Sequence, residues 1–270
     1  MGKITLLGVG VLCLMLVSNV FASEKVHNFD MGVESSYFIF KQSSDNVKEK
    51  GSLSGVFGTY TFKPQIENWL TKVVNVFKID AHFAYGNPNY KSSGNSTGVK
   101  DYLFEPRLLL GKDFLLSRVT VTPYSGFGYR LFFRDGKTED GFADDKYQYF
   151  YLPIGVSAEK ELQSGWKIGA LLEYDFLLNG SYAQASSELS NSLNTVTDTK
   201  NTLNKGYGIR AAINFGKKVG KVDLAVSPYV RYWSIGKSNT ATYYVNGVPF
   251  TYQAGKSSAM ELGLGLGMKF

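Results

Sequence analysis

One pair of side chains in this sequence has the types and spacing that hydrolysis could use. Asp80 and His82 stand two residues apart, so on an extended strand they share a face. A carboxylate can orient an imidazole that takes a proton from an attacking water. Two further acids, Asp144 and Asp145, fall in a polar stretch, and the only other histidine is His27. Because the supporting partners of a catalytic site are missing, we interpret Asp80 and His82 as a structural hydrogen-bonded pair and expect no enzymatic activity.

Charged residues of both signs share the face of Asp80 and recur at alternate positions between glycines. We expect them to pair inside an enclosed interior, because an unpaired buried charge is strongly unfavourable. The expected polar network comprises Glu34, Asp80, His82, Glu105, Arg107, Arg130, Glu173, Asp175, Arg210, Asp223, Arg231 and Glu261. No phosphate, nucleotide or metal motif is recognisable, so we predict no cofactor, no metal site and no catalytic residue.

The elements that position these residues have a hydrophobic period of two, which is typical of β-strands. In the clearest segment, 118–134, Val119, Val121, Phe127 and Leu131 occupy one face and glycines, threonines and Arg130 the other. The predicted strands are 29–41, 51–62, 73–85, 101–111, 118–134, 147–161, 166–178, 206–216, 222–235 and 259–270. Each is long enough to cross a bilayer, since a membrane-spanning strand needs about 9–11 residues.

The connections alternate in length along the chain. Long polar connections are predicted at 42–51, 86–100, 135–146, 179–204 and 237–258, and short ones at 112–117, 162–165 and 217–221. The connection after the second strand, 63–72, is longer than these short ones. Within 63–72 the spacing of Ile66, Leu70 and the following Val73 predicts a helical turn. Asn246-Gly247, between two strand-like runs, predicts a β-hairpin. Short turns on one rim and long loops on the other indicate a transmembrane β-barrel with short periplasmic turns and long extracellular loops.

A soluble β-sandwich or soluble barrel is the alternative, and it would put the apolar face inside. Here the opposite face is glycine and paired charge rather than a solvated exterior, which favours a lipid-facing apolar side. The last segment alternates to its end, with Leu262, Leu264 and Leu266 expected toward lipid and Glu261 toward the interior. We expect this strand to pair with the first and close the sheet. Aromatic girdles are predicted from Trp69, Tyr102, Tyr129, Tyr147, Trp166, Tyr174 and Tyr232.

The N-terminus predicts export. Lys3, an apolar run at 4–17 and small residues at Val20 and Ala22 are typical of a cleaved signal peptide, so we predict a signal peptide at 1–22 and one barrel domain at 23–270. The single cysteine, Cys13, lies in the predicted signal, so the mature chain can form no disulfide. The basic residues are scattered, which argues against a nucleic-acid partner.

The segments TPYSGFGYR (122–130) and YFYLPIGVSAEKEL (149–162), with a terminal alternating strand that ends on Phe270, resemble small bacterial outer-membrane β-barrel proteins of the OmpA-like and opacity-type porin superfamily. The resemblance implies location in the bacterial outer membrane and a C-terminal signal at Leu266, Met268 and Phe270 that the barrel-assembly machinery reads. Most members have eight strands, whereas about ten are counted here, with eight as the alternative.

Three functions are compatible with such a barrel. The first is an envelope-structural or surface-interaction role, adhesin- or receptor-like, with a lumen plugged by paired charges. The second is a small porin, which the near balance of interior charges disfavours. The third is an outer-membrane hydrolase of the omptin type, which would use Asp80 and His82. We favour the first, and expect as partners outer-membrane lipid and lipopolysaccharide, the assembly machinery and an unknown surface ligand, with the protein a monomer.

Overall fold

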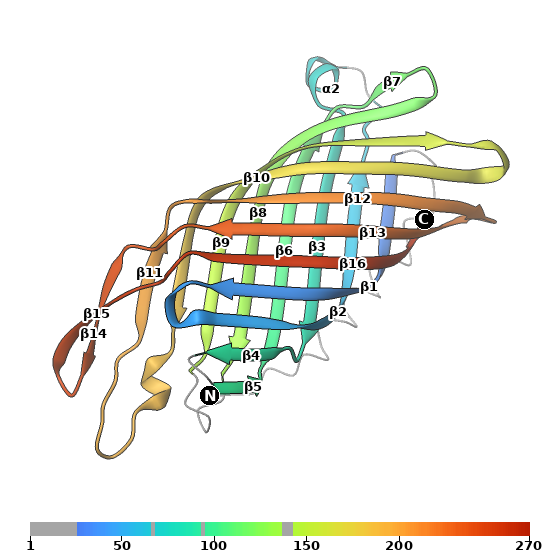
Figure 1. Cartoon of the computed structure of the whole chain (residues 1–270). Coiled ribbons are helices and arrows are strands. Elements are labelled where there is room, and N and C mark those ends of the chain that lie inside the picture. The colour runs from blue at the N-terminus through green and yellow to red at the C-terminus, as the bar shows by residue number, and fades with distance from the viewer. Residues whose placement is uncertain (1–25, 66–67, 93–94, 137–142) are drawn as a thin grey trace.

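The computed structural model describes the chain except residues 1–25, 66–67, 93–94 and 137–142. In the described part, ten long antiparallel strands form a closed barrel (Figure 1), which confirms ten rather than eight. They are β1 (His27–Gln42), β2 (Val47–Phe62), β3 (Val76–Gly86), β6 (Lys100–Gly111), β8 (Val119–Asp135), β9 (Asp145–Glu161), β10 (Trp166–Gln184), β12 (Gly206–Val219), β13 (Val222–Ile235) and β16 (Ser257–Lys269). The predicted signal peptide lies outside the described residues.

Closure is made by the first and last strands. β16 pairs antiparallel with β1, with Val33 opposite Leu266 and Phe40 opposite Ala259, and β1 also pairs with β2. The final residue is held as well, because the Phe270 amide donates to the Phe29 carbonyl at 2.8 Å. The barrel therefore has no free edge between its first and last strands, as the alternating C-terminus predicted.

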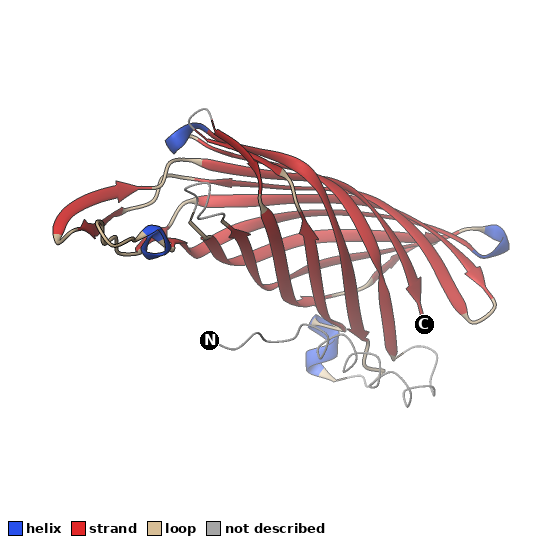
Figure 2. Ribbon diagram, turned by 90° about the horizontal axis from the view of Figure 1, so that it is seen from below, coloured by secondary structure: helices blue, strands red, loops and turns tan. Residues whose placement is uncertain are grey.

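Short elements occupy the connections and leave the wall to the strands (Figure 2). One rim, here the short-turn rim, carries α2 (Trp69–Val73), β7 (Phe114–Leu116), the 3-10 turn η3 (Gln163–Gly165) and the turn at Gly220. The opposite rim, the long-loop rim, carries η1 (Ser44–Asn46), β4 (Asn89–Ser92), β5 (Asn95–Gly98), η4 (Ser186–Leu189), β11 (Thr199–Leu203), β14 (Thr240–Val245) and β15 (Val248–Gln253). No helix in the described chain is long and apolar enough to cross a membrane.

Two of the predicted connections are confirmed in detail. The helical turn is α2, where the Asn68 side chain accepts a hydrogen bond from the Thr71 amide at 2.9 Å and caps the helix. The hairpin is β14–β15, and Asn246 and Gly247 both have positive φ, 52° and 78°. Two positive φ values define the turn that matches the twist of paired strands.

Two sequence-based expectations are wrong. The connection predicted at 42–51 is short, because β2 already begins at Val47 and alternates from there, with Val47 and Glu49 facing inward. Tyr147 was expected in an aromatic girdle but is buried, with its ring 5.4 Å from Phe40 and 4.7 Å from Tyr182. Its phase in β9 points it into the lumen.

The outer wall is apolar between the two rims. Phe127 is 64% exposed, Leu262 61% and Leu108 58%, although each lies within a long paired strand. Aromatic pairs accompany them on this face, such as Tyr129 with Phe150 at 4.8 Å and Tyr85 with Tyr102 at 5.1 Å. Apolar side chains this exposed around a whole barrel need a nonaqueous surrounding.

Candidate functional site

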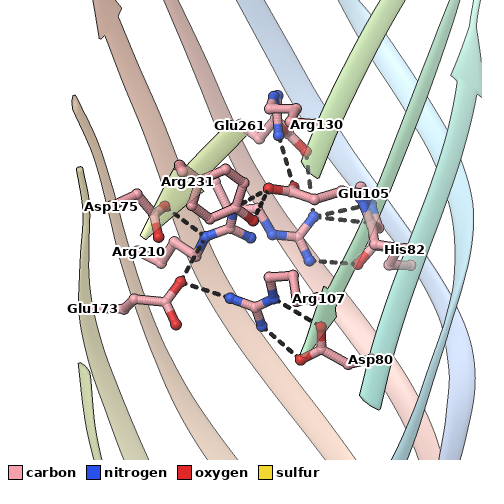
Figure 3. A network of polar contacts seen from close by, with 12 residues as sticks. Asp80, His82, Glu105, Arg107, Arg130, Glu173, Asp175, Arg210, Arg231 and Glu261 are labelled. Carbon is pink, nitrogen blue, oxygen red and sulfur yellow. Dashed lines mark hydrogen bonds and ion pairs between the residues drawn. The ribbon is translucent and has the colours of Figure 1, made fainter. Parts of the chain in front are cut away.

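The middle of the lumen contains a continuous network of ion pairs (Figure 3). Arg107 donates to both oxygens of Asp80 at 2.7 Å and to Glu173 at 2.6 Å. Arg210 lies 2.9 Å from both Glu173 and Asp175. These contacts tie β3, β6, β10 and β12 together across the interior. Each arginine therefore serves at least two carboxylates, as planar guanidinium groups can.

The network continues from Arg210 to Glu105 and then to the opposite wall. Arg130 joins Glu105 at 3.0 Å to Glu261 at 2.7 Å, and Arg231 joins Glu261 at 3.3 Å to Glu34 at 3.1 Å. Eleven of the twelve side chains expected from the sequence thus meet in one connected group. The twelfth, Asp223, lies apart and pairs with Lys167 at 2.6 Å.

His82 ends the network rather than pairing with Asp80. It is hydrogen-bonded to Glu34 and lies 3.0 Å from the Arg231 guanidinium, while Asp80 is held by Arg107. The expected hydrogen bond between Asp80 and His82 is not formed. His82 is only 6% exposed and borders, with Asp80, a cavity in the lower half of the lumen. The Arg231 guanidinium therefore holds the His82 imidazole and the Glu34 carboxylate in place.

An aromatic layer, which the sequence did not predict as a layer, lies in the lumen toward the long-loop rim. Phe38 and Phe132 pack at 5.4 Å, and Trp233 lies 5.3 Å from Tyr149 and 5.0 Å from Tyr151. All are buried. The Tyr151 hydroxyl also donates to Glu105 at 2.5 Å, so this layer is bonded to the ionic one below it. The inward phase of these aromatics along their strands was the available signal.

A second ionic cluster caps the aromatic layer at the long-loop rim. Arg134 donates to Glu49 at 2.5 Å and to Asp145 at 2.8 Å, and lies 3.8 Å from Asp101. Its guanidinium also stacks over the Phe40 ring at 5.0 Å. Sequence reasoning missed this cluster, because Glu49 and Asp145 were placed in loops. Ionic, aromatic and ionic layers together fill the upper half of the barrel.

The lower half is hollow. A cavity of about 370 Å³ lies between the central network and the short-turn rim. Its charged lining beyond the network consists of Asp30, Lys78, Glu159, Lys167, Asp223 and Lys269. The described residues contain no group of three or more metal-ligating side chains. The central network therefore forms the floor of this cavity.

A closed barrel of ten strands with an apolar outer wall and a charged interior is an integral β-barrel of the bacterial outer membrane. The family model of the autotransporter beta-domain matches residues 28–220, and the chain belongs to that family. The expected OmpA-like and opacity-type resemblance is thus confirmed only as far as an outer-membrane β-barrel. In such barrels the short turns are periplasmic, which assigns the long-loop rim to the cell exterior.

Several solved structures are similar to this chain at low sequence identity. The outer membrane protease OmpT from Escherichia coli is 11% identical with a TM-score of 0.54, covering 94% of this chain and 99% of that one. The transport unit of the autotransporter AIDA-I from Escherichia coli is 10% identical with a TM-score of 0.39, covering 97% of each chain. OprG from Pseudomonas aeruginosa is 11% identical with a TM-score of 0.35, covering 90% and 95%. No curated protein matches the sequence. The likeness to OmpT shows a shared fold alone.

Proposed function

We propose that this protein is a closed, non-conducting outer-membrane barrel that presents an ordered binding surface to the cell exterior, with an adhesin- or receptor-like role. The observation that carries the proposal is the contrast between the interior of the barrel and its long-loop rim. Three layers of side chains fill the upper half of the lumen, whereas the long-loop rim is extended by additional strands that bond to one another.

The filled lumen favours a structural barrel over a porin. Arg130, Arg134 and Trp233 are each no more than 2% exposed, although all three project into the interior. A ten-stranded barrel is only slightly wider than one that its side chains fill completely. Ions would have to break buried charge-assisted hydrogen bonds to pass, which supports low conductance.

The exterior surface is a built structure, here called the crown and defined as residues 186–203 and 240–253. The Thr195 amide donates to the Asn246 side chain at 2.8 Å, and the Asn246 amide donates to the Thr195 carbonyl at 2.8 Å. The Tyr244 amide donates to the Thr197 hydroxyl at 2.9 Å. Two loops far apart in sequence are thus joined, which favours a surface with a defined shape.

The crown also exposes apolar side chains. Leu193 is 84% exposed, Val248 54%, and Tyr244 and Phe250 each 46%. Register places Val248 and Phe250 on one face of the β14–β15 hairpin and Tyr244 on the other, so both faces of the projection offer apolar contacts. Tyrosine adds contact area at low entropy loss, as it does in other recognition loops. These features support a protein or glycan ligand rather than a purely mechanical role.

A hydrolase is the alternative that the likeness to the protease OmpT raises. The chain has two histidines, and both are described. His27 starts β1 at the short-turn rim and bonds Tyr60 at 2.6 Å, while His82 lies beneath the aromatic layer. An external substrate would meet neither ring, which supports a non-enzymatic role. Screening the purified barrel against peptide substrates, with His82→Ala as control, tests this alternative.

The proposal is tested with cells that display the barrel. Tyr244→Ser, Val248→Ser and Phe250→Ser, combined, should abolish cell–cell aggregation and adherence to protein-coated surfaces while leaving the surface amount unchanged. The control is Leu115→Ser with Leu116→Ser, which removes apolar side chains that are more exposed than these from the periplasmic rim. Adherence by the crown variant equal to that of the unaltered protein would sink the surface-interaction role. Planar-bilayer recordings with long, reproducible openings would sink the closed lumen.

A further inference from the structure

A row of lysines crosses the outer wall of the barrel at the long-loop rim. Lys41 of β1 stands directly opposite Lys48 of β2, and Lys48 stands directly opposite Lys91 of β4. Residues directly opposite on antiparallel strands point to the same face with Cβ atoms about 5 Å apart. All three side chains are exposed and point away from the lumen. Three like charges therefore lie side by side, in an arrangement that destabilises a sheet unless something neutralises it.

The protein itself supplies no neutralising group in its described part. No carboxylate there lies within 4.0 Å of Lys41, Lys48 or Lys91, whereas Lys100 on the same rim has Asp135 at 4.0 Å. Lys256, the residue before β16, adds a fourth exposed amine beside the row. A row of unpaired cations of this kind calls for an external anion.

Lys41, Lys48 and Lys256 border a groove at the long-loop rim. It has a volume of about 570 Å³ and is formed by residues of β1, β2, β13 and β16, including Lys41, Lys48, Tyr232, Ser234, Lys256 and Ser258. Register places Lys41, Ser258 and Ser234 in one line across the neighbouring strands. Hydroxyl groups thus continue the row of amines, and together they match a headgroup that carries both phosphates and sugar hydroxyls.

Directly below the groove the wall becomes apolar. The next outward row is Ile39, Met260 and Tyr232, and the row after it is Tyr37, Leu262 and Val230. Leu262 is 61% exposed and Tyr37 48%. A ligand seated on the lysines would therefore lay any acyl chains against a hydrocarbon surface. Along the strands, the site thus changes from charged at the exterior rim to apolar below it.

We infer that this face is a binding site for a phosphorylated glycolipid of the outer leaflet, the lipid A part of lipopolysaccharide. The phosphates bind Lys41, Lys48 and Lys91, and the acyl chains pack on the wall of β1, β13 and β16. Four amines suit a headgroup with more than one negative charge better than the single phosphate of a phospholipid. The site is independent of the crown, and its failure would leave the surface-interaction role untouched.

The test measures binding to the full-length barrel, purified and freed of lipid in detergent. The probes are bis-phosphorylated lipid A, the same lipid with both phosphates removed, and phosphatidylglycerol. Each lysine near an anionic surface is worth about fivefold in binding. Lys41→Gln, Lys48→Gln and Lys91→Gln combined should therefore bind bis-phosphorylated lipid A about 100-fold more weakly.

Lys146→Gln is the matched control. Lys146 is exposed and points outward from β9, which lies five strands from β1 around the barrel. Unlike the lysines of the row, it has no lysine opposite it, because its cross-strand neighbours are Phe133 and Ala183. This control should bind lipid A as the unaltered barrel does. Without lipid, the triple variant should unfold at the same temperature as the unaltered barrel or higher, because like-charge repulsion has been removed. The central substitution Lys48→Gln alone, expected to weaken binding about fivefold, keeps the test valid should the triple variant not fold.

Three results would overturn the inference. Equal lipid A binding by the triple variant and the unaltered barrel would show that the row is not the site. Equal binding of the dephosphorylated lipid would show that phosphate is not recognised. Phosphatidylglycerol binding as tightly as lipid A would reduce the face to a general attraction for anionic lipid.

Discussion

Arg130 donates a hydrogen bond to Glu261 at 2.7 Å across the full width of the barrel. Their strands, β8 and β16, lie five positions apart in a ring of ten, and the residues are 131 positions apart in sequence. Both side chains are 1% exposed. One side-chain pair therefore spans the lumen, which is possible only because the interior is narrow. The same pair braces opposite walls.

Arg130→Ala should be strongly destabilising, because it leaves Glu105 and Glu261 buried beside an empty space. Removal of one partner from a buried ion pair typically costs about 3–5 kcal/mol. We expect a lower midpoint for the heat-induced gel shift, in which a folded barrel migrates differently from the unfolded chain. Lys167→Ala, which breaks the more exposed pair with Asp223, is the control and should shift the midpoint less. An unchanged midpoint for Arg130→Ala would show that the network does not brace the wall.

Gly128→Ala should disturb the same ionic network indirectly, by displacing a tyrosine that is hydrogen-bonded to it. A Cβ atom at Gly128 would collide with the ring of Tyr151, whose hydroxyl donates to Glu105. Overpacking of this kind costs about 1–3 kcal/mol. Gly58→Ala in β2 is the control, since a Cβ there would meet nothing nearer than the Asp30 carbonyl at 4.0 Å. Urea titration should separate the two variants, and equal midpoints would show that Tyr151 moves aside freely.

The sequence was sufficient to predict the barrel, because alternation acts on each strand locally. Inward phase identified Arg130 and Glu261 as lumen residues before either could be paired. Pairing across the lumen depends on closure and stagger, which no local pattern encodes. Asp80 and His82 illustrate the limit, since they are near neighbours in sequence but bind Arg107 and Glu34 instead of each other.

The ends of the strands were also predicted inaccurately from the sequence. Glu49 and Asp145 belong to strands that continue beyond the membrane, where the residues are polar and read as loop. The upper ionic cluster around Arg134 was invisible for that reason. The aromatic layer was missed as a layer because single rings, such as Phe132 and Tyr147, look alike whether they face lipid or the lumen. Phase along β8 and β9 separates the two cases, but it does not show which rings from different strands meet, because that depends on closure of the barrel.

Phe270→Ser should reduce assembly more than it reduces stability. The terminal residue pairs with Phe29 through backbone hydrogen bonds, which a serine retains, so the finished barrel loses only one outward ring. If Leu266, Met268 and Phe270 form the signal that the assembly machinery reads, less barrel should reach the surface. Surface protease accessibility measures this. Met260→Ser, on the same face of β16 at its other end, is the control, and an equal loss in both variants would refute a specific terminal signal.

The turn between β6 and β7 should be sensitive to acid through Asp113. Burial acts to raise the pKa of this carboxyl, but hydrogen bonds from Lys63 and Thr122 outweigh it, and the pKa is lowered from its usual 3.8. A lowered folded-state pKa means that the carboxylate stabilises the turn above its ordinary pKa. That contribution is lost as pH falls through the lowered value.

Asp113→Asn should therefore weaken the turn at neutral pH and remove its pH dependence. Lys63 is 40% exposed at its side chain, so solvent screening limits the effect to about 0.5–1 kcal/mol. Amide hydrogen exchange at Phe114–Leu116 should quicken on acidification in the unaltered protein and be fast and pH-independent, after correction for the intrinsic rate, in Asp113→Asn. Asp135→Asn, which disturbs a looser pair on the opposite rim, should leave this turn unchanged. If exchange in the Asp113→Asn variant quickens on acidification as it does in the unaltered barrel, the turn responds to acid without this carboxylate. Asp113 would then not be the group that makes the turn sensitive to acid.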